Sequence, residues 1–156
     1  MARKEESKRY KEIRNARATH DFHIDEKLEC GIILVGTEVK SLRAGLGQIK
    51  DAFVRFDKKI PTLYHAHIAE YAFGNLANHK PIRPRRLLMN KREIIRWMHE
   101  VQAGGKTIIP IRLYFKNGLA KVEIALARGK KTFDKRQDVK EREDLRETQR
   151  MMRHRI

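Results

Sequence analysis

The dipeptide Asn117-Gly118 constrains the fold more than any other short feature of this sequence. Both residue types readily adopt the left-handed backbone that a two-residue hairpin turn requires. Strand-like stretches flank the turn, Thr107 to Phe115 before it and Lys121 to Ala127 after it. Because proline cannot donate to a sheet ladder, we expect a bulge or a sheet edge at Pro110. The sequence therefore predicts an antiparallel hairpin in this half of the chain.

Further β-rich stretches precede the hairpin, at residues 30–35, 49–56 and 62–68, with a turn expected in the segment DKKIP between the last two. Two helices are expected among them. One covers residues 37–42, and the other begins at Asn90, which has capping-box spacing to Glu93 and is followed by a glycine pair as a stop. Strands dominate, without a strand–helix–strand rhythm. We predict a mainly β fold, a small antiparallel barrel with helices packed on its outside.

Charge indicates the partner and divides the chain. Lysine and arginine number 36 against 20 acids, which gives a net charge of +16 in 156 residues. Phosphate backbones bind such proteins through counterion release, and an anionic membrane would attract them as well. We expect a basic N-terminal extension at residues 1–20 that packs on or near the barrel, a barrel domain at 21–127 and a basic tail at 128–156.

The tail contains good helix formers but few apolar residues to hold a helix on the core. Isolated helices of this length are marginally stable in water. We therefore expect residues from about 131 onward to be disordered in the free protein and helical when docked on RNA. Phe133, an aromatic residue among cations, is suited to stacking on a base.

Arginines also cluster at residues 83–86, with the sequence Arg-Pro-Arg-Arg. Nearby prolines favour an extended backbone, which would present the arginines as a row for phosphate contact. A solvated linker is the alternative interpretation.

Other classes of function find little support. The glycines match neither phosphate-binding motif, and His65 and His67 lack neighbours that would complete a metal site on one strand face. We expect no enzyme activity, no metal and no cofactor. The lone Cys30 is interpreted as a buried hydrophobic residue, which fits a reducing cytoplasm, and the sequence has neither a secretory signal nor a membrane-spanning stretch. We expect a cytoplasmic monomer without membrane contact.

Several blocks of sequence resemble one family closely. In chain order they are NARATHDF at 15–22, GI at 31–32, GTEVKSLRAG at 36–45, RRLLMNKREI at 85–94, IP at 109–110, LYFKNG at 113–118, KV at 121–122, GKK at 129–131 and DKR at 134–136. They are collinear and cover residues 15 to about 150. The chain resembles the SsrA-binding proteins, or small protein B, which partner transfer-messenger RNA in bacterial trans-translation.

The resemblance implies an OB-like, six-stranded antiparallel barrel with about three helices. One face of the barrel would bind the tRNA-like domain of transfer-messenger RNA. The residues at the family's positions for this contact are Glu29, Leu88 and Asn90, and the flanking motifs add His20 and Lys40.

The resemblance also implies that the tail enters the decoding centre and the empty mRNA channel of a stalled ribosome. Its contact residues there would be Gly129, Lys130, Lys131, Phe133, Asp134, Lys135 and Arg136.

Small departures from the family pattern occur at Ala16, where lysine is common, and at Met89, where leucine is more usual. Phe133 stands where histidine or tyrosine is frequent, so it keeps stacking and loses a ring hydrogen bond. An rRNA-binding structural or assembly protein of the ribosome is the alternative function, because a basic tail is typical of both.

Overall fold

The computed structural model describes residues 10–154, so the first nine residues of the expected N-terminal extension lie outside it. The strands are β1 (Ile13–Arg14), β2 (Phe22–Ile32), β3 (Gly47–Gln48), β4 (Phe53–Asp57), β5 (Ile60–Tyr64), β6 (His67–Ile68), β7 (Arg85–Leu88), β8 (Thr107–Lys116) and β9 (Leu119–Gly129). The helices are α2 (Ala18–Asp21), α3 (Gly36–Arg43), the 3-10 turn η1 (Asn75–Ala77), α4 (Lys91–Gln102) and α5 (Thr132–His154).

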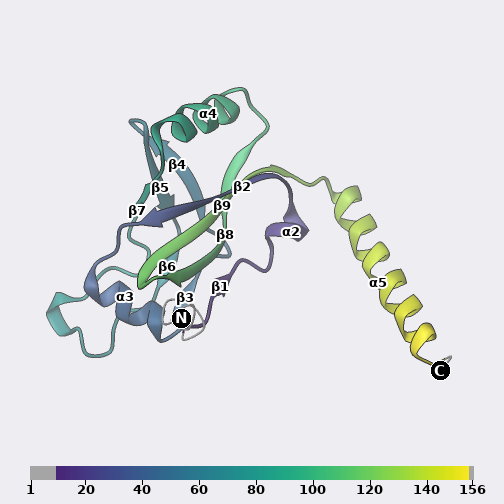
Figure 1. The fold of residues 1–156 in the computed structure, drawn as a ribbon, viewed down its shortest axis with the longest axis horizontal. Helices are drawn as coiled ribbons and strands as arrows, with labels where there is room; N and C mark the ends of the chain where they lie inside the picture. Colours follow the sequence, from purple (N-terminus) through teal and green to yellow (C-terminus); the bar gives the residue numbers. More distant parts are fainter. Residues whose placement is uncertain (1–9, 155–156) are drawn as a thin grey trace.

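Antiparallel strands close into a ring in the order β8, β4, β5, β7, β2 and β9, and β9 returns to β8 (Figure 1). Strand β1 joins β8 at Leu113 and Arg112, beyond the point where Val54 pairs with Ile108 to hold β4 against β8. Four α-helices accompany the ring in the described residues, α2 being a single turn. This confirms the OB-like, six-stranded antiparallel barrel.

The β8–β9 hairpin forms around Asn117 and Gly118, whose φ angles are 53° and 75°. The register of the hairpin shifts between Pro110 and Arg112, so the bulge expected at the proline is confirmed. The N-terminal segment docks there, because the Asn15 side-chain amide donates to the Pro110 carbonyl at 2.9 Å.

The strand expected at residues 30–35 is confirmed only for 30–32, which form the end of a longer strand, β2, that begins at Phe22. Residues 33–35 lie outside any strand, so that part of the prediction was wrong. Polar residues such as His23, Asp25 and Lys27 alternate along β2 with partly buried ones. This is the pattern of a strand with one face in solvent, but aspartate and lysine have low β-propensity, which concealed it.

The strands expected at 49–56 and 62–68 have different bounds in the structure, where β4 covers Phe53–Asp57 and β5 covers Ile60–Tyr64. Their hairpin turns at Lys58 and Lys59 alone, with φ angles of 48° and 66°, and Pro61 lies inside β5 opposite Phe56. The last two residues of the second stretch form the separate strand β6, which pairs with β3.

Both predicted helices are present, as α3 and α4, and the buried Trp97 packs α4 on the core. Asn90 stands at the N-cap of α4 with an extended backbone, as expected. Its side chain makes no capping hydrogen bond, so the capping-box prediction was wrong.

A buried ion pair joins α3 to β7. The carboxylate of Glu38 and the guanidinium of Arg85 are both 0% exposed, and Arg85 Nε donates to Glu38 Oε1 at 2.8 Å. Arg85 also donates to the carbonyls of Ala66 at 2.7 Å and Pro81 at 3.0 Å, and Arg83 donates to both oxygens of Glu38.

The expected row of phosphate-binding arginines at 83–86 was therefore wrong. Arg85 is inside the protein and Arg83 is held by Glu38, which leaves Arg86 as the exposed member. Burial by itself would raise the pKa of Glu38, but hydrogen bonds from Arg83 and the Val35 amide, with the charge of Arg85, hold that pKa below its usual value.

Helix α5 leaves the barrel after β9 and extends away from it (Figure 1), and none of its described residues is buried. The tail is thus helical in this structure. Disorder of residues 131 onward in the free protein stays a prediction.

Replacing Glu38 with glutamine should destabilise the fold by about 3–5 kcal/mol, because Arg85 would remain buried without a counter-charge. Since Glu38 titrates with a lowered pKa, the stability it contributes is present at neutral pH and is lost as the pH falls through that pKa. Urea unfolding at pH 7 and in steps from pH 5 down to pH 2 measures both effects.

The control for this experiment is Glu26→Gln, which breaks the exposed pair of Glu26 with Arg96 and should change stability little. Equal effects of the two substitutions would contradict a special role for the buried pair.

Candidate nucleic-acid interface

Three of the residues expected to bind RNA lie together in one hollow, which we call the β2–β7 hollow. Its lining residues are Glu29, Gly31, Leu88, Met89, Asn90, Glu93 and Lys121. The sheet register explains the grouping, because Gly31 is the partner of Leu88 on one side and of Lys121 on the other. Gly31 and Lys121 were not predicted from the sequence as site residues.

Leu88 is an apolar side chain held in the solvent, 60% exposed at the end of β7. A Cβ atom on Gly31 would lie 3.1 Å from Leu88 Cδ1 and 3.2 Å from Leu88 Cβ, so a larger residue there would press on this side chain. The glycine in β2 therefore leaves the space in which Leu88 lies over the strand. An exposed apolar group next to polar ones suits contact with a base or a ribose.

The Glu29 carboxylate accepts hydrogen bonds from the Tyr114 hydroxyl and from Lys116 Nζ, the latter at 3.3 Å. The Tyr114 hydrogen bond lowers the pKa of Glu29, and Lys116 adds to this effect against partial burial. Burial and the bond to Glu29 raise the pKa of Tyr114, so its hydroxyl remains a donor at neutral pH. Glu29 is thus an ionised acceptor with a fixed orientation, suited to a ribose hydroxyl or a base N–H group.

Asn90 borders the same hollow from the start of α4. Its backbone carbonyl accepts the first helical hydrogen bond, from the Ile94 amide at 3.0 Å. Since its side chain does not cap the helix, the amide's donor and acceptor face the solvent at an exposed position. They are available for an edge-on contact with a base.

The other two candidates for transfer-messenger RNA lie elsewhere. His20 is in α2, before the start of β2, and its Nδ1 lies 2.8 Å from Asp21 Oδ1. Lys40 is on α3, with its Nζ 5.2 Å from the centroid of the Tyr71 ring. Figure 1 shows α2 next to the base of α5 and α3 at the other end of the barrel.

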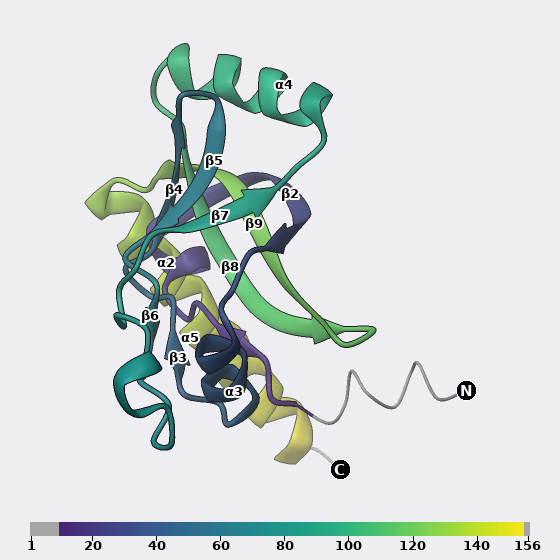
Figure 2. The same cartoon turned by 90° about the vertical axis from the view of Figure 1, so that its left-hand side faces the viewer.

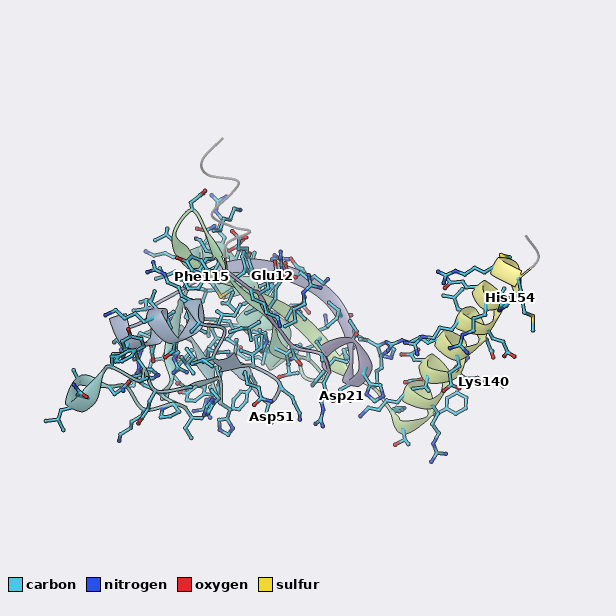
Figure 3. All side chains as sticks on the ribbon, turned by 90° about the horizontal axis from the view of Figure 1, so that it is seen from below. Glu12, Asp21, Asp51, Phe115, Lys140 and His154 are labelled. Carbon is cyan, nitrogen blue, oxygen red and sulfur yellow. The ribbon has the colours of Figure 1, made fainter. Side chains whose placement is uncertain are left out.

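The expected ribosome-binding residues at the start of the tail divide into two groups. Lys130 belongs to the first, because its side chain is 7% exposed and its ammonium group donates to the Thr19 carbonyl and to Asp138. Lys135 Nζ lies 3.4 Å from Asp21 Oδ1, and Asp134 is 3.6 Å from His23. Figure 3 shows Asp21 at this junction between the barrel and the tail.

The second group is exposed and consists of Gly129, Lys131, Phe133 and Arg136. Phe133 is 73% exposed and shares a shallow hollow on α5 with Arg136, Gln137 and Lys140, and with two acids, Glu141 and Asp144. An aromatic ring with cations along one helix face is suited to base stacking with phosphate contact.

His65 and His67 do not share a strand, since β5 ends at Tyr64 and β6 begins at His67. Within residues 10–154, no group of three histidine, cysteine, aspartate or glutamate side chains is placed to hold a metal ion. None of the helices in the described part of the chain has both the length and the apolarity of a membrane span.

Removing the Tyr114 hydroxyl by a Tyr114→Phe substitution should raise the pKa of Glu29, because the ionised carboxylate loses its strongest stabilising contact. An NMR titration of the Glu29 carboxyl carbon measures this pKa directly. Tyr64→Phe, which removes a hydroxyl at the end of β5, should leave it unchanged, because β7 separates β5 from β2 in the sheet. An unaltered pKa in Tyr114→Phe would contradict the described role of the hydroxyl.

Comparisons with known proteins agree on one family. The model of the SmpB protein family matches residues 12–154. The SsrA-binding protein of Thermobifida fusca is 49% identical over 141 residues, 90% of this chain and 88% of that protein. The SsrA-binding protein of Pelotomaculum thermopropionicum is 49% identical over 142 residues, 91% of this chain and 93% of that protein.

A solved structure also matches, described as "tmRNA-SmpB: a journey to the center of the bacterial ribosome". Its TM-score is 0.66 at 45% identity, and the match covers 78% of this chain and 85% of that chain.

Proposed function

Because the chain belongs to the SmpB protein family, we propose that it binds transfer-messenger RNA and delivers it to stalled ribosomes for trans-translation. The barrel binds the tRNA-like domain of that RNA. The tail probes the decoding centre and the empty mRNA channel. Support comes from relatives named SsrA-binding proteins and from a structural match that pairs tmRNA with SmpB on the bacterial ribosome.

The observation that carries the barrel's part is the grouping of Glu29, Leu88 and Asn90 in the β2–β7 hollow. The hollow offers an ionised acceptor, an apolar side chain and an amide within one small area. Structured RNA is recognised through ribose hydroxyls and exposed bases rather than through its deep major groove. This combination fits such a target and requires no catalytic step, metal or cofactor.

The tail's part rests on charge and reach. Residues 128–156 include eleven basic and six acidic side chains. The 23 residues of α5 span roughly 35 Å at the helical rise, enough to extend well beyond the barrel. In a channel already filled by message, both the space and the phosphate contacts are taken, so docking of the tail favours ribosomes that have lost their message.

Lys130 has a different part in this proposal from the exposed tail residues. Its ammonium group is already bound to Thr19 and Asp138, so contact with ribosomal RNA requires release from both. While these two contacts are in place, Lys130 orients the tail relative to the barrel. The protein acts in the cytoplasm, as a monomer on its RNA.

Asn90→Ala should lower the affinity for the tRNA-like domain about tenfold or more, the effect of losing one well-placed polar contact to a base. The melting temperature should stay close to that of the original protein, because the side chain does not cap α4. Gel shift and thermal unfolding give the two values, with Gln102→Ala as an exposed amide-to-methyl control on the same helix. If the affinity is unchanged and the melting temperature is lower, Asn90 caps the helix and does not bind RNA, which would contradict the proposal.

Truncation after Arg128 should leave the affinity for the tRNA-like domain largely intact and abolish peptide tagging on stalled ribosomes. A reconstituted translation reaction on a message without a stop codon measures tagging, and gel shift measures binding. Parallel loss of both would show that the barrel and the tail do not divide the work. Equal binding of full-length protein to bulk rRNA would favour the ribosomal structural or assembly protein instead.

A further inference from the structure

The segment between β6 and β7 carries an aromatic pair that the proposed function does not use. This loop, residues 69–84, projects beyond α3 at the opposite end of the molecule from α5 (Figures 1 and 2). The rings of Tyr71 and Phe73 meet nearly edge to face, with centroids 5.6 Å apart and an angle of 67°. Phe73 is 80% exposed.

The loop has a fixed internal frame, so the exposure of Phe73 does not come from an unstructured segment. The Asn78 side chain accepts from the Tyr71 amide at 3.0 Å and donates to the Tyr71 carbonyl at 2.7 Å. A Cβ atom on Gly74 would lie 2.8 Å from Asn78 Nδ2, so glycine allows this close approach. The Asn78 side chain thereby joins the two ends of the turn formed by residues 71–78.

His79 fastens the frame to the body of the protein. It is 7% exposed, and its Nε2 donates to the Ile68 carbonyl at 2.9 Å. Its Nδ1 forms a hydrogen bond with the Thr37 hydroxyl, 2.8 Å away on α3. Both ring nitrogens are satisfied, so His79 connects the loop to β6 and to α3.

Positive charge lies beside the aromatic pair. Lys40 Nζ lies 5.2 Å from the Tyr71 centroid, and Lys80 is exposed in the same loop. Arg43, also on α3, lies against the Tyr10 and Phe115 rings instead, with Cζ 5.6 Å and 5.9 Å from their centroids. Glu70 is the exposed acid beside them, whereas Glu38 is buried and neutralised by its arginines. Cations beside exposed rings complement a nucleotide, whose base stacks while its phosphate takes the charge.

We propose that Phe73, Tyr71 and Lys40 form a second RNA-binding site, which accepts one unpaired nucleotide. The base stacks on Phe73, and Lys40 binds the adjoining phosphate while Tyr71 supports both side chains. The site depends on the proposed function only for the choice of RNA as partner. Lys40 does not line the β2–β7 hollow, and this second site gives it a role in RNA binding at Tyr71 instead.

Phe73→Trp tests stacking directly, because the protein's one native tryptophan, Trp97, is fully buried and supplies a constant background. The probe is a ten-nucleotide oligouridine RNA. Adding this RNA should quench the fluorescence of the tryptophan introduced at position 73, and the quenching should saturate. The control, Ile95→Trp, places an equally isolated tryptophan at a 69% exposed position of α4. Equal quenching at both positions would overturn the proposal in favour of nonspecific coating by the polyanion.

A second pair of variants separates stacking from plain apolar contact. Phe73→Leu keeps an apolar side chain without a ring and should weaken oligouridine binding about tenfold, whereas Phe73→Tyr should retain it. Full binding by Phe73→Leu would overturn the proposal and leave this loop as a surface for a protein partner. Lys40→Gln should reduce the slope of log K against log salt by about 0.7, and an unchanged slope would exclude the phosphate contact.

These measurements do not depend on delivery to the ribosome. Saturable quenching at Phe73→Trp together with unaltered binding in Asn90→Ala would refute the proposed use of the β2–β7 hollow alone. Weaker binding in Asn90→Ala, together with no saturable quenching in Phe73→Trp, would refute the second site alone.

Discussion

The buried ion pair between Glu38 and Arg85 is the interaction on which the proposed RNA-binding surfaces depend. Both side chains are removed from water, so each is tolerated only because the other is present. Glu38 fixes α3, which carries Lys40, and Arg85 fixes the start of β7, which ends at Leu88. The same guanidinium binds the carbonyl of Ala66, directly before β6, and the carbonyl of Pro81, within the loop of residues 69–84. A single charge pair therefore positions a helix, a strand and a loop.

The sequence predicted the parts of the fold that depend on local chemistry. Asn117 and Gly118 adopt the backbone of the expected turn, and Pro110 disrupts the ladder where it cannot donate. Strand β2 escaped prediction over most of its length because its charged residues have low strand propensity and are placed by pairing with β9, about a hundred residues later. The arginines at 83–86 failed for a similar reason, since their partner Glu38 is 45 to 47 residues away.

The candidate site also combines residues that are far apart in the sequence, which local chemistry cannot predict. Glu29, Leu88 and Asn90 were predicted only from family resemblance, because no chemical pattern along the chain unites positions so far apart. Gly31 and Tyr114, which shape the hollow and orient Glu29, were missed as site residues. Gly31 had a usable signal, since a glycine within a strand often marks a close approach. The tail lysines look equivalent in sequence, and only the fold shows that Lys130 is enclosed and Lys131 is exposed.

We propose that the barrel and the tail are separate recognition surfaces, with the tail free of the RNA that the barrel holds. Hydrogen exchange of the protein alone and with the isolated tRNA-like domain distinguishes the two surfaces. Exchange should slow at residues 28–32 and 86–93 on RNA binding and stay unchanged across 136–154. Protection of 136–154 by the tRNA-like domain alone, to the same extent as the hollow, would contradict this proposal.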